Sequence, residues 1–301
     1  MILSFAVRRL LSSSRHGAAV PAFTFVPAFT LPALILVALM GIGLTACSSS
    51  KDDLPLSSDM ASLPPDQLYN AGVDSLQTKR YADAVKRFDA VEQNYPYASW
   101  ATKAQLMHGY AEYKRGHYTD AIGALERYIQ LHPSNPDSAY AYYLRALCYY
   151  EEISDIQRDQ SNTEKALSAL NDVVNRYPET SYARDARLKI DLCRDHLAGK
   201  EMEVGRWYEG QHLYVAALER FQTVITDYQT TNHVPEALER VTEVYLAMGL
   251  PDEARKTATV LGYNYPGNEW YQKAYDLLVT NGVVPDKNGK IEKPGFFSRI
   301  F

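Results

Sequence analysis

The chain has 301 residues, with 36 acidic and 31 basic side chains and a formal net charge of −5. A mildly acidic chain argues against a broad, nonspecific nucleic-acid surface, because such a surface needs clustered positive charge. Three cysteines, Cys47, Cys148 and Cys193, are too few for a disulfide framework or a cysteine-rich zinc module.

The first predicted element is an export signal over residues 1–46. Residues 31–44 form an apolar run, LPALILVALMGIGL, and Arg8, Arg9 and Arg15 precede it. The run is short for a bilayer span but has the length of the hydrophobic region of a secretory signal. Because Arg15 lies far from the run, a true start downstream of Met1 stays open.

The apolar run ends at Leu44-Thr45-Ala46-Cys47, which resembles a bacterial lipobox. The resemblance implies acylation of the Cys47 thiol, cleavage before it and acylation of the freed amine, and several acyl chains anchor a protein stably. Ser48, in place of Asp, implies export to the outer membrane of a Gram-negative cell. Residues 47–63 are then a lipidated cysteine and a flexible tether on the periplasmic face. An ordinary signal, or a short transmembrane helix with an incidental cysteine, is the alternative.

Residues 64–282 carry a degenerate repeat. Five segments, 81–96, 118–133, 163–178, 214–229 and 251–266, share a key alanine at the same place: Ala84, Ala121, Ala166, Ala217 and Ala254. A proline follows twelve residues later in four of them, and Gln229 replaces it in the fourth segment. Gly72, Gly109 and Gly205 stand twelve residues before three of these alanines. The pattern resembles the tetratricopeptide repeat, in which a small residue on the first helix lets the second helix approach closely.

The predicted fold class is all-α: a tetratricopeptide-repeat solenoid of about five helix-turn-helix units. The key alanines are 37, 45, 51 and 37 residues apart, so the fourth unit holds about four extra helical turns. This spacing predicts one long helix over 181–211, or two helices that abut near Gly199. Residues 151–162 are predicted to be a loop, 268–282 a closing helix and 283–301 a loose tail. No window shows the alternation of a strand.

The sequence contains no recognisable catalytic motif. GxxxxGK[ST], HExxH, GxSxG and CxxC are all missing. No two histidines of the mature chain lie three or four residues apart, so a metal clamp within one helix is missing too. We therefore expect no enzymatic activity, no metal and no cofactor. For Cys148 and Cys193, a disulfide and a pair of buried free thiols both stay open.

Tyrosine is over-represented, with 23 copies against 9 Phe and 3 Trp. In this repeat the first helix of each unit lines the concave face. The repeat frame places toward that face Tyr69, Tyr110, Tyr113, Tyr140, Tyr143 and Tyr150, with the aliphatic residues Val73, Leu76, Leu106 and Leu147. An apolar groove with phenolic hydroxyls suits a peptide rich in aromatic residues. The alternative is that these rings only pack the first helices together.

Five segments form a combined pattern, and two of them, the one that holds PSNPDSAYAYYLRAL and the one that ends in KEMEVGRWY, are more particular than a generic repeat. The five segments are LPPDQLYNAG (63–72), NYPYASWATKAQL (94–106), LHPSNPDSAYAYYLRALCYY (131–150), RDQSNTEKAL (158–167) and a stretch over 176–208 that ends in KEMEVGRWY. Together with the lipobox, they resemble the BamD family of outer-membrane assembly lipoproteins over about residues 63–266.

The resemblance implies a non-catalytic scaffold of the β-barrel assembly machine. It also implies that the C-terminal units bind a POTRA domain of BamA, beside other lipoproteins of the machine. The N-terminal units would receive unfolded outer-membrane proteins by their aromatic targeting signal.

Four basic residues of the long helix, Arg187, Lys189, Arg194 and Arg206, are the predicted partner-docking residues, because they could meet an acidic POTRA face. The alternative is a solvated face balanced by neighbouring aspartates. Three other functions compete with the assembly role: a general envelope scaffold in another assembly or peptidoglycan-linked complex, an enzyme with an unrecognised site, and a cytosolic adaptor if Cys47 carries no lipid.

Overall fold

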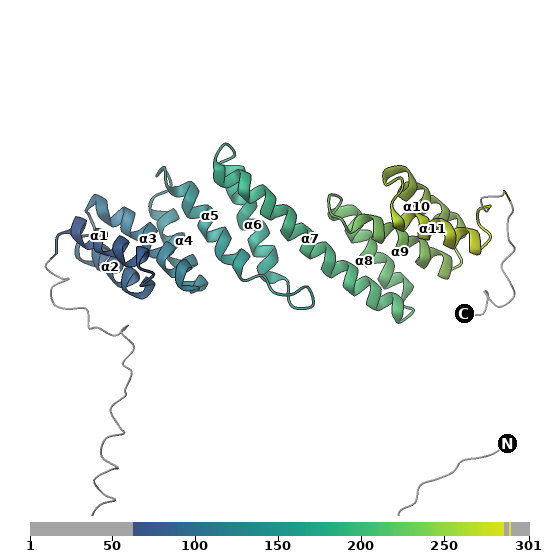
Figure 1. Cartoon of the computed structure of the whole chain (residues 1–301), viewed down its shortest axis with the longest axis horizontal. Coiled ribbons are helices and arrows are strands. Elements are labelled where there is room, and N and C mark those ends of the chain that lie inside the picture. The colour runs from purple at the N-terminus through teal and green to yellow at the C-terminus, as the bar shows by residue number, and fades with distance from the viewer. Residues whose placement is uncertain (1–62, 286–288, 290–301) are drawn as a thin grey trace, which may run out of the picture. The chain divides into compact units, whose positions relative to one another are not determined.

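The computed structural model describes residues 63–285 and 289. These residues form helices and no strand, which confirms the predicted all-α class (Figure 1). The helices are α1 Pro65–Gln77, α2 Tyr81–Asn94, α3 Ser99–Arg115, α4 Tyr118–Leu131, α5 Ser138–Glu151, α6 Ser161–Arg176, α7 Ser181–Gly210, α8 Tyr214–Asp227, α9 Val234–Ala247, α10 Pro251–Asn264 and α11 Glu269–Thr280. Cys47, most of the predicted tether and most of the predicted tail lie outside the described residues.

The helices form five antiparallel hairpins and a closing helix. Each helix packs on the next one in the chain, and the first helices of neighbouring hairpins also touch, as α1 does α3 and α3 does α5. The hairpins α1–α2, α3–α4, α5–α6, α7–α8 and α9–α10 each hold one key alanine, and all five alanines are fully buried. The tetratricopeptide-repeat solenoid is thereby confirmed. No described helix has the length and apolar character needed to cross a membrane.

The small residues of the repeat sit where the two helices of a hairpin touch. A Cβ atom added to Gly72 would lie 2.6 Å from Cε1 of Phe88, and one added to Gly205 would lie 2.4 Å from Cε1 of Phe221. At Gly109 the nearest atom is Cδ2 of Leu125, at 2.8 Å. Real Cβ atoms do not approach other atoms this closely, so the glycines let the second helix dock.

The second helix of every hairpin ends at the same place, with or without the proline. The residue eleven after each key alanine is Tyr95, His132, Tyr177, Tyr228 or Tyr265, with φ between −121° and −135°. A following proline disfavours the helical conformation of the residue before it. Tyr228 departs from that conformation too, although Gln229 follows, so packing also ends the helix. Four of these five residues are tyrosines, which explains part of the tyrosine excess by structure.

The turns inside the hairpins share a left-handed residue. It lies five residues before the key alanine in four units: Lys79 at φ 59°, Gly116 at 78°, His212 at 59° and Gly249 at 75°. The third unit has the longer connection 152–160 between α5 and α6 instead.

Helix α7 is one continuous helix of 30 residues. The prediction of a long helix is confirmed, and the alternative of two helices abutting at Gly199 is wrong. Gly199 is buried, and a Cβ atom there would meet Nε2 of His233 at 3.3 Å. Close packing on this face therefore keeps the helix intact where glycine alone would weaken it.

Two hydrophobic clusters meet along α7. Ile190 and Cys193 pack in the cluster of α5 and α6, whereas Ala198 and Met202 pack in the cluster of α8 to α11. The 152–160 connection lies against the middle of α7. There Nε2 of His196 is 2.8 Å from the Ser154 carbonyl oxygen, and Nζ of Lys200 donates to the Gln157 carbonyl at 3.3 Å.

Candidate functional site

Tyrosines from three successive first helices come together in the middle of the array. Helix α3 supplies Tyr110 and Tyr113, α5 supplies Tyr140, Tyr143 and Tyr150, and α7 supplies Tyr182; these six residues are called the tyrosine surface below. The ring of Tyr182 lies 5.5 Å from that of Tyr140 and 5.4 Å from that of Tyr143, the latter pair stacked at 29°. The pKa of Tyr140 is raised by burial and then by its neighbours Tyr110, Tyr182 and Tyr113.

Charged side chains border the tyrosine surface. The Tyr113 hydroxyl donates to Glu151 Oε1 at 3.2 Å, and the Tyr143 hydroxyl donates to Asp185. Lys189 lies 3.2 Å from the Asp185 carboxylate and 5.3 Å from the ring centre of Tyr150. The hydrogen bond from Tyr143, followed by Lys189, lowers the pKa of Asp185 against the effect of burial.

A second lysine lies beside the α3 tyrosines. Nζ of Lys114 is 5.7 Å from the ring centre of Tyr110 and 5.8 Å from that of Tyr113. The tyrosine surface therefore offers apolar ring faces, phenolic oxygens and two ammonium groups.

Five of the six predicted groove tyrosines belong to this surface, and Tyr69 does not. Tyr69 packs against Phe88 at 5.5 Å and Trp100 at 5.0 Å, in the cluster of the first unit. All six predicted rings are half-buried, so each one both packs its helix and leaves part of its surface free. Tyr182 was not predicted. The signal that could have revealed it is its place in the first turn of the long helix, just after the third repeat segment, since first helices line the concave face.

The four predicted docking residues of α7 do not share one face. Lys189 belongs to the border of the tyrosine surface. Arg187 is exposed and donates to the Pro178 carbonyl at 3.2 Å, and Arg194, seven residues later, lies on the same side of the helix. Arg206 is turned toward α9, where its Nη1 donates to Glu236 Oε1 at 2.9 Å.

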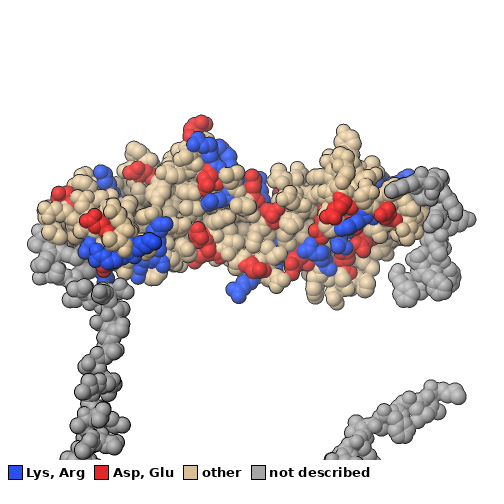
Figure 2. Space-filling view, viewed as in Figure 1, with Lys and Arg blue, Asp and Glu red and all other residues tan. Residues whose placement is uncertain are grey.

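Arg206 belongs to a network of two arginines and four glutamates on α7 and α9, called the charge network below: Arg206, Glu209, Glu236, Glu239, Arg240 and Glu243. Arg240 reaches Glu243 at 2.9 Å, Glu209 and Glu239 at 3.7 Å and Glu236 at 3.9 Å. A pocket of about 380 Å³ opens beside it, lined by Arg206, Glu209, Arg240, Glu243 and Tyr214 among others. Figure 2 shows acidic and basic groups intermingled over the C-terminal half of the array.

The charged form of two carboxyl groups in the charge network is disfavoured by burial. Burial raises the pKa of Glu209 to about 7 and that of Glu239 to about 7, although Arg240 opposes the shift. Glu209 Oε1, Glu239 Oε2 and Arg240 Nε are buried, and within the described part of the chain they have no hydrogen-bond partner. Four acids share two arginines here, so the network can accept a further cationic or hydrogen-bond-donating group.

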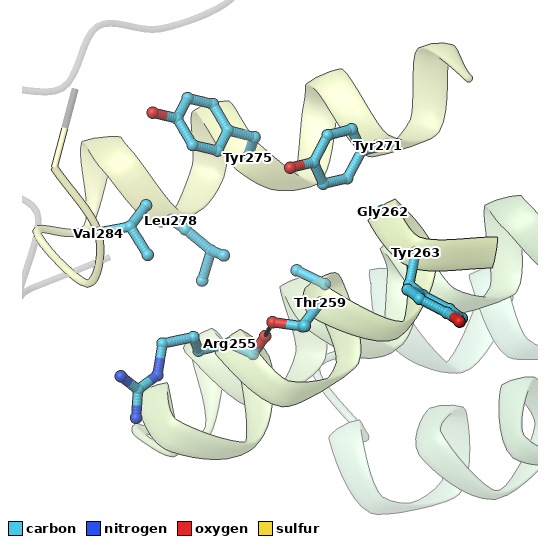
Figure 3. Close-up of a pocket in the computed structure, with 9 residues that line it drawn as sticks. Arg255, Thr259, Gly262, Tyr263, Tyr271, Tyr275, Leu278 and Val284 are labelled. Carbon is cyan, nitrogen blue, oxygen red and sulfur yellow. Dashed lines mark hydrogen bonds between the residues drawn. The ribbon is translucent and has the colours of Figure 1, made fainter. Parts of the chain in front are cut away.

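The last two helices form a second open pocket, of about 350 Å³ (Figure 3). Arg255, Thr259 and Tyr263 line it from α10, and Tyr271 and Tyr275 from α11. A Cβ atom on Gly262 would lie 2.4 Å from the Tyr271 ring, so the glycine is what lets α11 dock. The Tyr275 hydroxyl donates to the Pro285 carbonyl at 2.8 Å and holds the chain at the rim.

Cys148 and Cys193 are free, buried thiols, so the disulfide alternative is wrong. Burial raises the pKa of Cys148 to about 12 and that of Cys193 to about 11. Both therefore act as small apolar groups of the core and not as nucleophiles.

Comparisons with known proteins agree on one family. A family model described as an outer membrane lipoprotein, YfiO, matches residues 61–261. The chain is 51% identical over 222 residues to the outer membrane protein assembly factor BamD of Caulobacter vibrioides, covering 74% of this chain and 73% of that protein. It is 45% identical over 246 residues to the BamD of Rickettsia prowazekii, covering 81% and 96%.

Among solved structures, the chain is similar to the tetratricopeptide-repeat domain of P58(IPK). The two are 16% identical, with 71% of this chain and 55% of that chain covered and a TM-score of 0.37.

Proposed function

We infer the function from the family: this chain belongs to the BamD family of outer membrane lipoproteins, and it acts in outer membrane protein assembly. We propose that it does so as a non-catalytic scaffold, which holds polypeptides in position for the machinery that inserts them. The repeat fold supports this role, because stacked hairpins expose a long surface for other polypeptides.

A lipid on Cys47 would hold the scaffold on the periplasmic face of the outer membrane. The lipobox and the family description support this placement. Tethering raises the local concentration of the binding surfaces near the membrane without any new contact. Palmitate labelling of the wild-type chain and its absence in Cys47→Ala would test the anchor, whereas equal labelling of the two would refute it.

The proposed client is an unfolded outer-membrane protein whose aromatic C-terminal segment lies on the tyrosine surface. The observation that supports this most is the convergence of rings from α3, α5 and α7 with Lys114 and Lys189 beside them. Tyrosine faces pack against aromatic side chains, and an ammonium group attracts a chain-terminal carboxylate.

The proposed partner of α7 to α11 is a POTRA domain of BamA, together with other lipoproteins of the machine. The charge network and the α10–α11 pocket support this assignment, since they pair open apolar surface with unsatisfied charge. Arg187 and Arg194 present a separate basic face for an acidic partner.

The client proposal is tested with a fluorescent peptide from the C-terminus of an outer-membrane β-barrel protein. The triple variant Tyr110→Ala, Tyr143→Ala and Tyr150→Ala should weaken its binding at least tenfold by fluorescence anisotropy. Tyr97→Ala is the matched control, because that ring is fully exposed and lies outside the surface. Unchanged affinity in a folded triple variant would remove the client site.

The charge of the client terminus is tested separately, with variants that spare the core. Amidation of the peptide's C-terminus should weaken binding to the wild-type chain, and Lys189→Ala should weaken binding of the free acid but not of the amide. Purification in mild detergent tests the partner: stoichiometric BamA supports the proposal, and a different envelope complex would support the general-scaffold alternative.

A further inference from the structure

Three metal-ligating side chains meet between the first and second repeat units. Asp89 and Glu92 lie one turn apart on α2, and His108 lies on the facing helix α3. One ligand atom from each residue lies within 4.8 Å of the others, and all three side chains are half-buried. No sequence pattern reveals this cluster, because its members come from two helices and include a single histidine.

Two atoms of the cluster lack the partners that burial normally demands. Glu92 Oε2 and His108 Nδ1 are both shielded from solvent, and neither has a hydrogen-bond partner among the residues that the structure describes. Two of the three other carboxylate oxygens are held: Asp89 Oδ2 accepts from Gln93 at 2.6 Å and Glu92 Oε1 accepts from Gln105 at 3.2 Å. Buried polar atoms are nearly always satisfied, so two unpartnered atoms in one cluster of metal-ligating side chains point to a missing ligand partner.

The second triad of similar composition makes a useful contrast. Glu112, His117 and Asp120 also lie within ligand distance of one another. There, however, Arg115 donates to both oxygens of Glu112, at 2.9 and 3.0 Å, and His117 pairs with Glu112 at 3.4 Å. Both carboxylate oxygens of Glu112 are therefore already held by Arg115, whereas Glu92 Oε2 in the Asp89 triad is not held in this way.

We propose that Asp89, Glu92 and His108 form a binding site for a divalent cation of the zinc class. One imidazole and two carboxylates supply three ligands, and water supplies the fourth, as in an open tetrahedral zinc site. Ligand atoms on such a zinc lie about 3.4 Å apart, so the three side chains close inward by roughly an ångström on binding. The neighbouring Gln93 and Gln105 amides then orient the carboxylates.

Arg127 is the group that the metal would displace. Its Nη2 lies 3.7 Å from Glu92 Oε2, beyond hydrogen-bond distance, and its side chain is 52% exposed. The guanidinium can therefore move into water when the cation binds. A bound cation would join α2 to α3 and so tie the first repeat unit to the second.

The test is calorimetric titration of the full chain with Zn²⁺, in mild detergent and a buffer that does not bind zinc. One equivalent should bind, and the midpoint of thermal unfolding should rise with zinc concentration. His108→Ala and Asp89→Asn should each lower the affinity at least tenfold. Arg127→Ala should raise it, because the competing cation is gone.

His117→Ala is the matched control, since it removes a histidine from the satisfied triad. It should leave the affinity within twofold of that of the wild-type chain. Three results would overturn the site: no zinc binding by the folded wild-type chain, equal binding by folded His108→Ala, or loss of binding in His117→Ala. Circular dichroism of each variant shows that it is folded before the titration is interpreted.

Discussion

At the scale of single residues, the left-handed position inside the hairpin turns shows where the repeat tolerates strain. Gly116 and Gly249 take positive φ without a Cβ atom, whereas Lys79 and His212 take it with one, both at 59°. A Cβ atom in this region costs about 1–2 kcal/mol, and glycine gives back part of that through the freedom of the unfolded chain. Glycine at either of the two non-glycine turns should therefore raise the free energy of unfolding.

Lys79→Gly is expected to raise the free energy of unfolding by up to about 1 kcal/mol, because it relieves the strain at an exposed side chain. Gly116→Ala, at the equivalent turn, should lower it by about the same amount. Urea unfolding of both variants measures the two shifts. A marked loss of stability in Lys79→Gly would mean that the lysine side chain itself holds the turn.

A second residue-scale prediction concerns the buried carboxyl of Glu239. Its pKa rises from 4.5 to about 7 in the folded chain, so between these values the folded state binds more protons than the unfolded state. Stability from this group is therefore fully present below pH 4.5 and is lost as the pH rises through 7.

Glu239→Gln keeps the shape and removes the titration. Its free energy of unfolding should consequently change less between pH 5 and pH 8 than that of the wild-type chain. Denaturant unfolding at four pH values measures the slope, with exposed Glu164→Gln as the control. Parallel slopes for wild type and Glu239→Gln would contradict the assignment.

At the scale of helices, the contact between a glycine and a large apolar residue sets how closely each hairpin closes. Gly205→Ala places a Cβ atom 2.4 Å from the Phe221 ring edge, so one of the two helices must shift. Overpacking costs about 1–3 kcal/mol, and alanine returns about 1 through helix propensity. We expect a net loss of about 1–2 kcal/mol in the free energy of unfolding.

Gly210→Ala provides the comparison within the same helix, because among the described residues nothing outside its own helical turn and chain neighbours lies within 4 Å of the added Cβ. That variant should be neutral or slightly more stable. Phe221→Leu combined with Gly205→Ala should recover part of the loss. If Gly205→Ala is as stable as the wild-type chain, the glycine is not what sets the approach of α8.

The helices themselves were predictable because their signals are local. The key alanine marks all five hairpins, a glycine twelve residues before it marks three, and a proline twelve residues after it marks four. At Gly199 local signals failed, since only the contact with His233, the residue just before α9, shows why α7 continues. Tyr182 and the Asp89 triad were missed for the same reason, because each depends on a neighbouring element.

Rotation along one helix separates the four predicted docking residues onto different faces. Lys189 and Arg187 are two residues apart, so they point to nearly opposite sides of α7, although a list of basic residues groups them together.

At the scale of the whole array, α7 is the member that joins two hydrophobic clusters. Its N-terminal half packs with α5 and α6, and its C-terminal half packs with α8 to α11. The connection 152–160 lies against its centre through His196 and Lys200. Transmission of stability between the two halves therefore depends on an unbroken α7.

Lys200→Pro should separate the two halves. A proline in a helix interior removes a hydrogen bond and costs about 3 kcal/mol or more. We expect wild-type unfolding in one transition and two resolved transitions in the variant, with amide exchange faster in α8 to α11 than in α1 to α6. Lys200→Ala removes the bond to Gln157 alone and should keep a single transition. One transition in both variants would show that coupling does not pass through α7.

The α10–α11 pocket has a consequence for engineering. Tyr271 packs against Gly262 in the way that Phe88 packs against Gly72 inside the array. The pocket beside this pair is nevertheless open to solvent (Figure 3). Helices α10 and α11 therefore leave a surface on which another hairpin could pack. A designed hairpin could be grafted after Pro285 to cover it. Each added hairpin would lengthen the array by one repeat unit, so the distance between the membrane and a bound client could be varied in steps of one unit.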